Sequence, residues 1–211
     1  MINHEVFLDK LIQNLSDLPG ESAHKVLMPL NRPFTSEALK KKPNYRSSAV
    51  AIILYPNGVS INCILIQRPD YDGAHGGQIS FPGGKMDNTD SDLEFTARRE
   101  AFEEINLPLN AGTFIGKLSE IYIPPSNFLV EPNLFFVDKL PILTPDEREV
   151  ASIIQFNIQQ LLSTDTFKIG DIQQNNLIRK NTPYFEIEEH KVWGATGMIL
   201  AELKEIISRF T

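Results

Sequence analysis

Three carboxylates lie close together in the sequence, at Glu100, Glu103 and Glu104. On a helix, residues three and four positions apart share one side within about one turn of height, so the spacing predicts that these carboxylates converge. Like charges at this spacing destabilise a helix by a few tenths of a kcal/mol per pair, and a bound cation would compensate them. Oxygen ligands on a rigid element suit Mg²⁺ or Mn²⁺, which retain water and bridge to phosphate groups. The simpler alternative is a solvated acidic face paired with Arg98 and Arg99.

The residues before these glutamates predict a short strand, a turn and a capped helix. Ile79–Phe81 leads into Pro82-Gly83-Gly84, where glycine allows backbone angles that other residues resist. Ser91, followed three residues later by Glu94, forms a capping box at the predicted start of the helix. An apolar residue then recurs at every fourth position, at Leu93, Ala97, Ala101 and Ile105. This stripe would hold the glutamate helix against a core.

The turn and helix together resemble the Nudix box, whose pattern is Gx5Ex7REUxEExGU with U a bulky aliphatic residue. The matching residues are Gly84, Arg99, Glu100, Ala101, Glu103, Glu104 and Leu107. Asp90 stands at the first glutamate but is followed by eight residues rather than seven before Arg99, and Asn106 replaces the last glycine. Asparagine tolerates the left-handed conformation of a helix end, so this replacement is mild.

The resemblance to Nudix enzymes carries an expectation for the fold, the metal and the catalytic groups. It implies an α/β/α sandwich with a mixed central sheet, and a phosphoanhydride hydrolase that depends on Mg²⁺ or Mn²⁺. Glu100, Glu103 and Glu104 are the implied metal ligands, the Gly84 carbonyl is a further one, and Arg99 orients them as an ion-pair partner. Glu103 is the first candidate for the general base. Glu120 and Glu131 are the next candidates for the general base.

A second resemblance begins upstream of the box. Residues 64–84 read ILIQRPDYDGAHGGQISFPGG and are similar to the signature LLTxRSx3Rx3Gx3FPGG of coenzyme A pyrophosphatases. Arg68 and Gly77 fall in register, whereas Gly73 replaces the second arginine, so one cation expected near the substrate phosphates is missing. The resemblance implies that coenzyme A or an acyl derivative is cleaved to 3′,5′-ADP and (acyl-)4′-phosphopantetheine. The expected substrate-binding residues are Arg68, His75, Gly77, Gln78 and Lys85.

Two other functions compete with this expectation. A pyrophosphatase of ADP-ribose, NADH or another nucleoside diphosphate derivative would share the metal chemistry and differ in how the rest of the substrate is held. A catalytically silent nucleotide sensor would retain the box as a fold element only. The sensor has no need for three mutually repelling carboxylates, which favours an enzyme.

The rest of the chain predicts a single domain over residues 1–211, with an N-terminal helix and extended connection in 1–47 and the catalytic fold in 48–211. Apolar spacing and turn residues indicate helices, strands separated by Pro56-Asn57-Gly58 and other turns, and one irregular segment. The expected helices cover 3–16, 146–162 and 195–210, the strands cover 49–54, 61–67, 114–122, 128–137 and 184–192, and 163–182 is irregular. Trp193 is expected to be a core residue or to anchor the last helix.

Composition limits the class of partner. The 211 residues carry a net charge of −7, with a pI near 5.1, and no basic stripe that would bind a nucleic acid polymer. No apolar run approaches the ~20 residues of a membrane span, and the N-terminus lacks a secretory pattern, so a cytoplasmic protein with no membrane partner is expected. The only cysteine, Cys63, lies in an apolar run and is expected to be buried. The sequence is compatible with a homodimer and does not require one.

Overall fold

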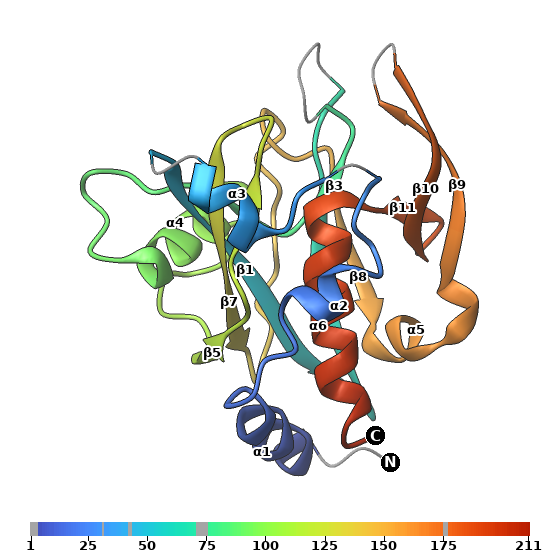
Figure 1. The fold of residues 1–211 in the computed structure, drawn as a ribbon. Coiled ribbons are helices and arrows are strands. Elements are labelled where there is room, and N and C mark those ends of the chain that lie inside the picture. The colour runs from blue at the N-terminus through green and yellow to red at the C-terminus, as the bar shows by residue number, and fades with distance from the viewer. Residues whose placement is uncertain (1–3, 31, 42–43, 71–75, 175–176) are drawn as a thin grey trace.

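The computed structural model describes residues 4–30, 32–41, 44–70, 76–174 and 177–211 (Figure 1). Its helices are α1 (His4–Asn14), α2 (Glu21–His24), α3 (Thr35–Lys41), α4 (Leu93–Ile105), α5 (Ile158–Leu162) and α6 (Gly194–Ser208), with a 3₁₀ turn at Thr164–Thr166. The strands are β1 (Arg46–Asn57), β2 (Ser60–Gln67), β3 (Ile79–Ser80), β4 (Gly83–Lys85), β5 (Thr113–Lys117), β6 (Ile121–Ile123), β7 (Phe128–Phe136), β8 (Ser152–Asn157), β9 (Phe167–Gln174), β10 (Leu177–Ile187) and β11 (His190–Val192).

The central sheet is mixed, as the sequence predicted. β1 pairs in parallel with β7 along nine residues, from Arg46 opposite Phe128 to Leu54 opposite Phe136. All other pairs of this sheet are antiparallel, and they include the β1–β2 hairpin. The main strand order is β3-β2-β1-β7-β5, with β4 on β1, β6 on β7 and β8 on β2.

β1 and β2 separate beyond their hairpin, and the short strands β3 and β4 fill the space between them. β2 pairs with β1 through Cys63 and with β3 through Ile66 and Gln67. β1 pairs with β4 at Ser48–Val50. The turn at Pro82 therefore carries the chain from β2 to β1, where Gly83 and Gly84 contact Glu104 and Glu100 in the second half of the glutamate helix.

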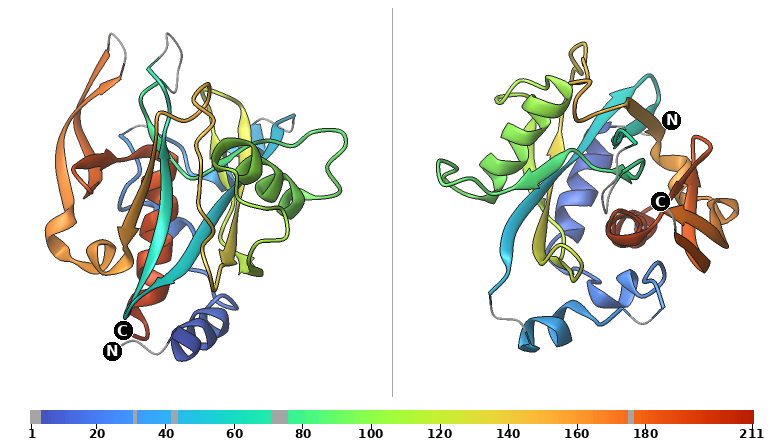
Figure 2. Two further views of the ribbon diagram at one scale, coloured as in Figure 1. Left: turned by 180° about the vertical axis from the view of Figure 1, so that it is seen from behind. Right: turned by 90° about the horizontal axis from the view of Figure 1, so that it is seen from above.

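The two faces of the central sheet are covered by different helices, which gives the expected sandwich (Figure 2). Alternate residues of β1 point to opposite faces: Ala51 and Ile53 contact the core under α4, whereas Ile52 and Leu54 contact the core under α6. Cys63 is fully buried in the α6-side core, as predicted. Within the described ranges, no helix is both long and apolar enough to cross a bilayer.

The N-terminal segment is less extended than the sequence predicted, because α2 and α3 interrupt it. α2 contacts α6 through a buried pair: His24 Nε2 lies 2.9 Å from Glu202 Oε2, and Glu202 also accepts hydrogen bonds from Gly20 and Ser119. Further along, Arg32 donates to the Tyr122 carbonyl at 2.7 Å. The segment is thus tied to α6 and to β6. Pro29 and Pro33 lie between these two short helices, and together with Pro43 they obscured both helices in the sequence.

Two predictions for the C-terminal third were wrong. Residues 152–157, expected within a helix, form β8, and only Ile158–Leu162 is helical. Residues 163–182, expected to be irregular, are mostly strand, since β9 and β10 form an antiparallel hairpin that continues into β11. β9 is largely exposed, so it needs few apolar residues and lacks the alternation that marks a half-buried strand. The last helix, α6, is confirmed.

Candidate active site

The helix α4 begins one residue later than the capping box predicted. The N-cap is Asp92, whose carboxylate accepts a hydrogen bond from the Phe95 amide at 2.8 Å. Ser91 instead donates to Asp92. At the other end Asn106 adopts the left-handed conformation, with φ of 56°, as its place in the pattern predicted.

Arg99 is the centre of the site's hydrogen bonding. Its guanidinium makes a two-point contact with Asp90, at 2.9 and 3.0 Å, and donates to the Lys85 carbonyl at 3.0 Å. The remaining Nη1 group donates to Glu100 and Glu103, at 2.9 and 2.8 Å. Asp90, whose role the shifted spacing left open, is therefore the residue that fixes Arg99. Contact with Arg99 holds the pKa of Asp90 down at about 2 against the cost of its desolvation.

The three glutamates do not form one preassembled group. Glu104 is buried and accepts a hydrogen bond from the Gly83 amide at 2.8 Å, with Arg68 at 3.5 Å from its other oxygen. Glu100 lies over Gly84, so close that a Cβ there would be 2.4 Å from its carboxyl carbon. Glu103 is held toward solvent by Arg99, with its side chain 51% exposed. Glu100 and Glu104 thus border β4, and Glu103 stands at the rim.

Burial makes the carboxyl groups of Glu100 and Glu104 easier to protonate. Desolvation raises the pKa of Glu104 to about 8, although Arg68 and the Gly83 amide oppose the shift. Desolvation also raises the pKa of Glu100, and neighbouring carboxylates add to both shifts. Negative charge is therefore disfavoured at this position unless a cation compensates it.

One acidic residue of this site was missed by the sequence reasoning. The charge of Glu149 raises the pKa of both Glu100 and Glu104, so the loop before β8 brings a fourth carboxylate toward them. This loop is fixed to the end of α4, where Thr144 and Asp146 donate to the carbonyls of Ile105 and Glu104. Only the tertiary fold brings Glu149 here, because no spacing rule links it to the box. Of the reserve candidates for the general base, Glu131 lies on β7 in the same row as Ala49 and Gly84 and pairs with Lys117 at 2.7 Å. Desolvation, together with the charge of Glu131, raises the pKa of Glu120.

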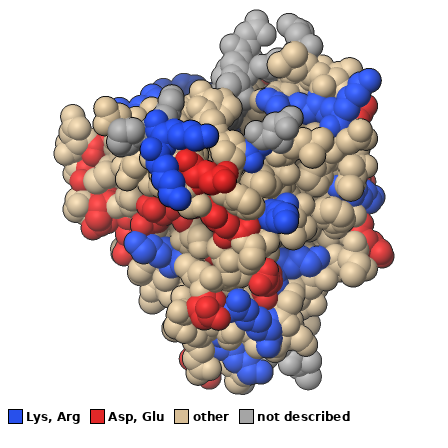
Figure 3. All heavy atoms as spheres, in the orientation of Figure 1, with Lys and Arg blue, Asp and Glu red and all other residues tan. Residues whose placement is uncertain are grey.

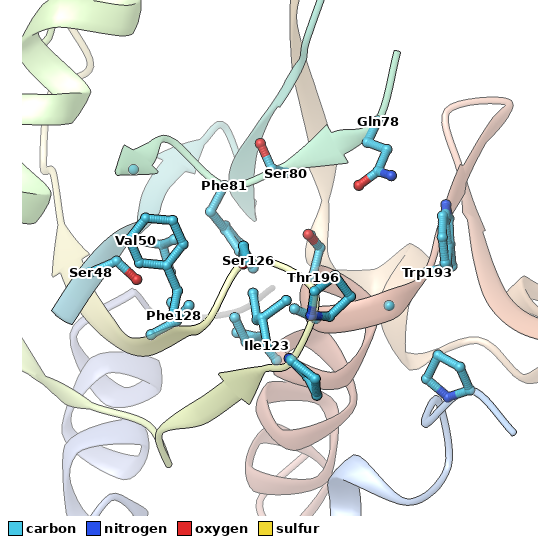
Figure 4. Close-up of a pocket in the computed structure, with 18 of the residues that line it drawn as sticks. Ser48, Val50, Gln78, Ser80, Phe81, Ile123, Ser126, Phe128, Trp193 and Thr196 are labelled. Carbon is cyan, nitrogen blue, oxygen red and sulfur yellow. The ribbon is translucent and has the colours of Figure 1, made fainter. Parts of the chain in front are cut away.

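A cavity of about 750 Å³ lies beside β4 on the side away from α4. Its floor is formed by β1 and β7, and its walls by the turn after β6, by Trp193 with the start of α6 (Figure 4), and by Pro29, Leu30, Arg32 and Pro33. The lining is mostly apolar. Its charged members, among the described residues, are four basic side chains and no acidic one: Arg32, Arg68, Lys85 and Arg179. Acidic side chains gather instead on the side of the molecule that carries α4 (Figure 3).

Most of the predicted substrate-binding residues border this cavity. Arg68, Gln78 and Lys85 line it, and Gly77 borders a smaller neighbouring hollow that also contains Trp193. Gly77 has φ of +67°, and a Cβ would lie 2.4 Å from the Asp70 carboxylate, so the position requires glycine. His75 and Gly73 lie outside the described residues. Trp193 precedes α6 as expected, yet it is half-buried and faces the cavity, with the Arg179 guanidinium 5.5 Å from its ring centroid.

Known proteins share this sequence and this fold. The NUDIX domain profile matches residues 45–175. The chain belongs to the Nudix family. It is 32% identical over 147 residues to the protein described as "Uncharacterized Nudix hydrolase NudL" from Yersinia pestis (strain Pestoides F), covering 69% of this chain and 72% of the relative. The NudL protein of Yersinia pseudotuberculosis serotype O:3 (strain YPIII) matches to the same extent.

Solved Nudix structures confirm the fold. The Nudix hydrolase RenU of M. Smegmatis superposes with a TM-score of 0.54 at 15% identity, covering 79% of this chain and 88% of that one. A Nudix hydrolase of Nitrosomonas europaea gives 0.52 at 17% identity, over 79% and 72%. This Nudix protein is accordingly a pyrophosphohydrolase of nucleoside diphosphate derivatives, in a family of enzymes that use divalent cations.

The residues of the Nudix box fit a divalent cation. The candidate side-chain ligands beside β4 are carboxylate oxygens, which suit a hard cation. A Cβ on Gly84 would lie 2.4 Å from the Glu100 carboxyl carbon, and burial raises the pKa values of Glu100 and Glu104 despite their contacts with Arg99 and Arg68. Among the described residues, however, no three acidic, histidine or cysteine side chains are already arranged as a metal site. Side-chain rotation would therefore accompany cation binding.

Proposed function

We propose that this Nudix hydrolase cleaves the phosphoanhydride of coenzyme A or acyl-coenzyme A, giving 3′,5′-ADP and (acyl-)4′-phosphopantetheine. The observation that carries the proposal is the position of the cavity. Its charged lining is basic only among the described residues, although the protein has a net charge of −7, and it shares Gly83, Gly84 and Lys85 with the site of the glutamate helix. Strands β3 and β4 lie between the cavity and the glutamate helix, at the end of the segment that is similar to coenzyme A pyrophosphatases.

We infer that the diphosphate binds at the residues that the cavity and the glutamate site share. Arg68 and Lys85 supply positive charge at this edge of the cavity, and Arg68 is already tied to Glu104 and to the Gly83 carbonyl. Mg²⁺ or Mn²⁺ would be held by Glu100, Glu104 and the Gly84 carbonyl, with Glu103 contributing at the rim. When bound, such a cation neutralises the phosphate oxygens and lowers the pKa of a coordinated water.

The reaction needs one proton acceptor and one leaving group. A water oxygen attacks one phosphorus, the bond from that phosphorus to the bridging oxygen breaks, and the bridging oxygen departs with the other phosphate. The water proton passes to a carboxylate base, for which Glu103 is our candidate because it is exposed at the rim. Arg99 holds Glu103 and Glu100 in one arrangement while this happens.

The substrate assignment is tested by comparing kcat/KM for coenzyme A, its 3′-dephospho form, ADP-ribose and NADH, first with Mg²⁺ and then with Mn²⁺. We expect coenzyme A or its acyl derivative to be preferred. A preference of about tenfold or more for ADP-ribose or NADH, roughly 1.4 kcal/mol in transition-state binding, would leave only the broader pyrophosphohydrolase activity. Binding of all four compounds without turnover would favour the nucleotide sensor instead.

The base is tested by comparing Glu103→Gln with Glu149→Gln. We expect Glu103→Gln to lower kcat by ~100-fold or more, the range of general acid–base contributions, and Glu149→Gln to lower it by less than ~10-fold. A larger loss of kcat in Glu149→Gln than in Glu103→Gln would indicate that the base is Glu149, in the loop before β8. Metal affinity, measured by titration with Mn²⁺, separates loss of the base from loss of a ligand.

A further inference from the structure

Arg32 is a charged residue of the cavity that the Nudix box does not account for. It lies in the N-terminal segment, before residues 45–175 that match the family profile, and it lines the cavity between Pro29 and Pro33. Its guanidinium donates to the Tyr122 carbonyl at 2.7 Å, and no described carboxylate forms an ion pair with it. A half-buried guanidinium has five N–H donors and is costly to desolvate unless an anion compensates its charge. Burial lowers the pKa of Arg32 to about 10, which reflects that cost.

The sheet register shows that Arg32 is remote from the diphosphate edge. Lys85 pairs with Ser48, Ser48 with Val130, and Val130 with Ile121, so these residues form one row across β4, β1, β7 and β6. Three inter-strand spacings separate the two ends of the row, or about 14 Å. Arg32 is attached to Tyr122, next to the far end of that row. The cavity therefore has basic groups at two opposite edges, with an apolar floor between them.

From this placement, we propose that Arg32 binds a phosphate monoester of the substrate that is separate from the scissile diphosphate. If the proposed function holds, this group is the 3′-phosphate of coenzyme A. Arginine suits such a group because its planar N–H fork matches phosphate oxygens at two points. Arg32 would thus supply the charge that is absent at Gly73, where the coenzyme A pyrophosphatase signature has its second arginine.

The test compares coenzyme A with 3′-dephospho-coenzyme A in three variants. Arg32→Gln removes the charge and retains a donor for the Tyr122 carbonyl, whereas Arg32→Lys retains the charge. Thr35→Val is the matched control, because the Thr35 hydroxyl accepts from the Tyr122 amide and ties the same segment to β6 without a charge. All three melting temperatures are measured first, to confirm folding.

We expect Arg32→Gln to lower kcat/KM for coenzyme A by about tenfold or more, mainly through KM, and to change that for the dephospho form by less than about twofold. Arg32→Lys should recover part of the loss, and Thr35→Val should affect both substrates equally. An equal loss with both substrates in Arg32→Gln, or no loss with either, would overturn the proposal. The first result would mean that Arg32 only holds the segment or contacts the diphosphate.

A binding measurement separates this proposal from the proposed function. Calorimetry with 3′,5′-ADP and with 5′-AMP reports the 3′-phosphate contact without turnover. Tighter binding of 3′,5′-ADP by the wild type, lost in Arg32→Gln, would support the phosphate site even if coenzyme A is not cleaved. Equal affinity for both nucleotides in the wild type would overturn the site, even if coenzyme A is a substrate.

Discussion

At the scale of single residues, the three carboxylates of α4 differ in environment, although their spacing in the sequence predicts only that they share one side of the helix. Glu104 is buried against β4, Glu100 lies over Gly84, and Glu103 is exposed. Desolvation disfavours a charge on Glu100 and on Glu104, whereas the Glu103 side chain is 51% exposed. Substitutions at the three positions should therefore have different effects on stability and on activity.

We predict that Glu100→Gln or Glu104→Gln lowers kcat by more than ~100-fold at saturating Mg²⁺, because a proposed ligand is lost. Thermal stability should stay unchanged or rise slightly, since a neutral amide replaces a carboxyl whose charge the buried position disfavours. In Glu104→Gln, the amide oxygen of the introduced side chain can still accept from the Gly83 amide. Activity and melting temperature are measured on the same samples. Retained turnover in both variants would show that the cation binds elsewhere.

Asp90 should contribute to stability through Arg99, and its contribution should depend on pH. We predict that Asp90→Asn lowers the free energy of unfolding by about 1–3 kcal/mol at pH 7, because a charged, two-point contact is lost. The folded-state pKa of Asp90, about 2, lies below the ordinary 3.8, so its contribution is fully present above that ordinary value. The difference from wild type should shrink as the pH falls from about 4 to 2.

Asp92→Asn is the control for this measurement. Asparagine caps a helix about as well as aspartate, so this variant should differ from wild type by less than ~0.5 kcal/mol although it also removes a carboxylate near the start of α4. A loss in Asp92→Asn equal to that in Asp90→Asn would mean that net charge, rather than the contact with Arg99, determines the effect.

At the scale of secondary-structure elements, the site depends on the close approach of α4 and β4. We predict that Gly84→Ala lowers kcat by ~10-fold or more while the protein stays folded, because the new Cβ would lie 2.4 Å from the Glu100 carboxyl carbon and displace it. Gly58→Ala is the control. No described atom lies within 4 Å of a Cβ at Gly58, so that variant should lose about 1 kcal/mol of stability from its positive φ and retain activity. Full activity of Gly84→Ala would exclude a catalytic position for Glu100.

The elements that were predicted correctly are those with strong local signals. α4 was found from its apolar stripe, and the β1–β2 hairpin from two β-rich runs around Gly58. β8 was taken for a helix because Val150, Ile154 and Ile158 recur at every fourth position, and only pairing with β2 decides between the two. The β9–β10 hairpin carries little apolar signal, since much of it is solvent-exposed. The same holds for the candidate site. The residues of the Nudix box were predicted from their local spacing, whereas Glu149 and Arg32 reach the site only through the tertiary fold.

At the scale of the whole molecule, α6 and the N-terminal segment are joined by one buried carboxylate. Glu202 is fully buried and accepts hydrogen bonds from Gly20 and Ser119 beside its contact with His24. Desolvation alone would raise the pKa of Glu202, but these contacts outweigh it and lower the value. The cavity wall formed by Pro29, Leu30, Arg32 and Pro33 begins five residues after His24.

We predict that Glu202→Gln lowers the free energy of unfolding by about 2 kcal/mol or more, because several buried donors lose a charged acceptor. The lowered pKa places the contribution of Glu202 above the ordinary carboxyl pKa of 4.5, and it should be lost as the pH falls through the folded-state value. Chemical denaturation at several pH values measures both effects. Glu205→Gln, on the same helix and with only a 3.9 Å contact to Arg209, should cost less than ~0.5 kcal/mol. Equal losses in the two variants would refute a special role for Glu202.

The burial of Cys63 has a consequence for an enzyme whose proposed substrate ends in a thiol. Cys63 lies in β2 and its side chain is fully buried in the core. This desolvation raises the pKa of the Cys63 thiol to about 12. Disulfide exchange requires an accessible thiolate, so the folded protein offers oxidised coenzyme A no thiolate with which to react. Turnover can then proceed in a changing redox environment without covalent trapping of the enzyme by its own substrate.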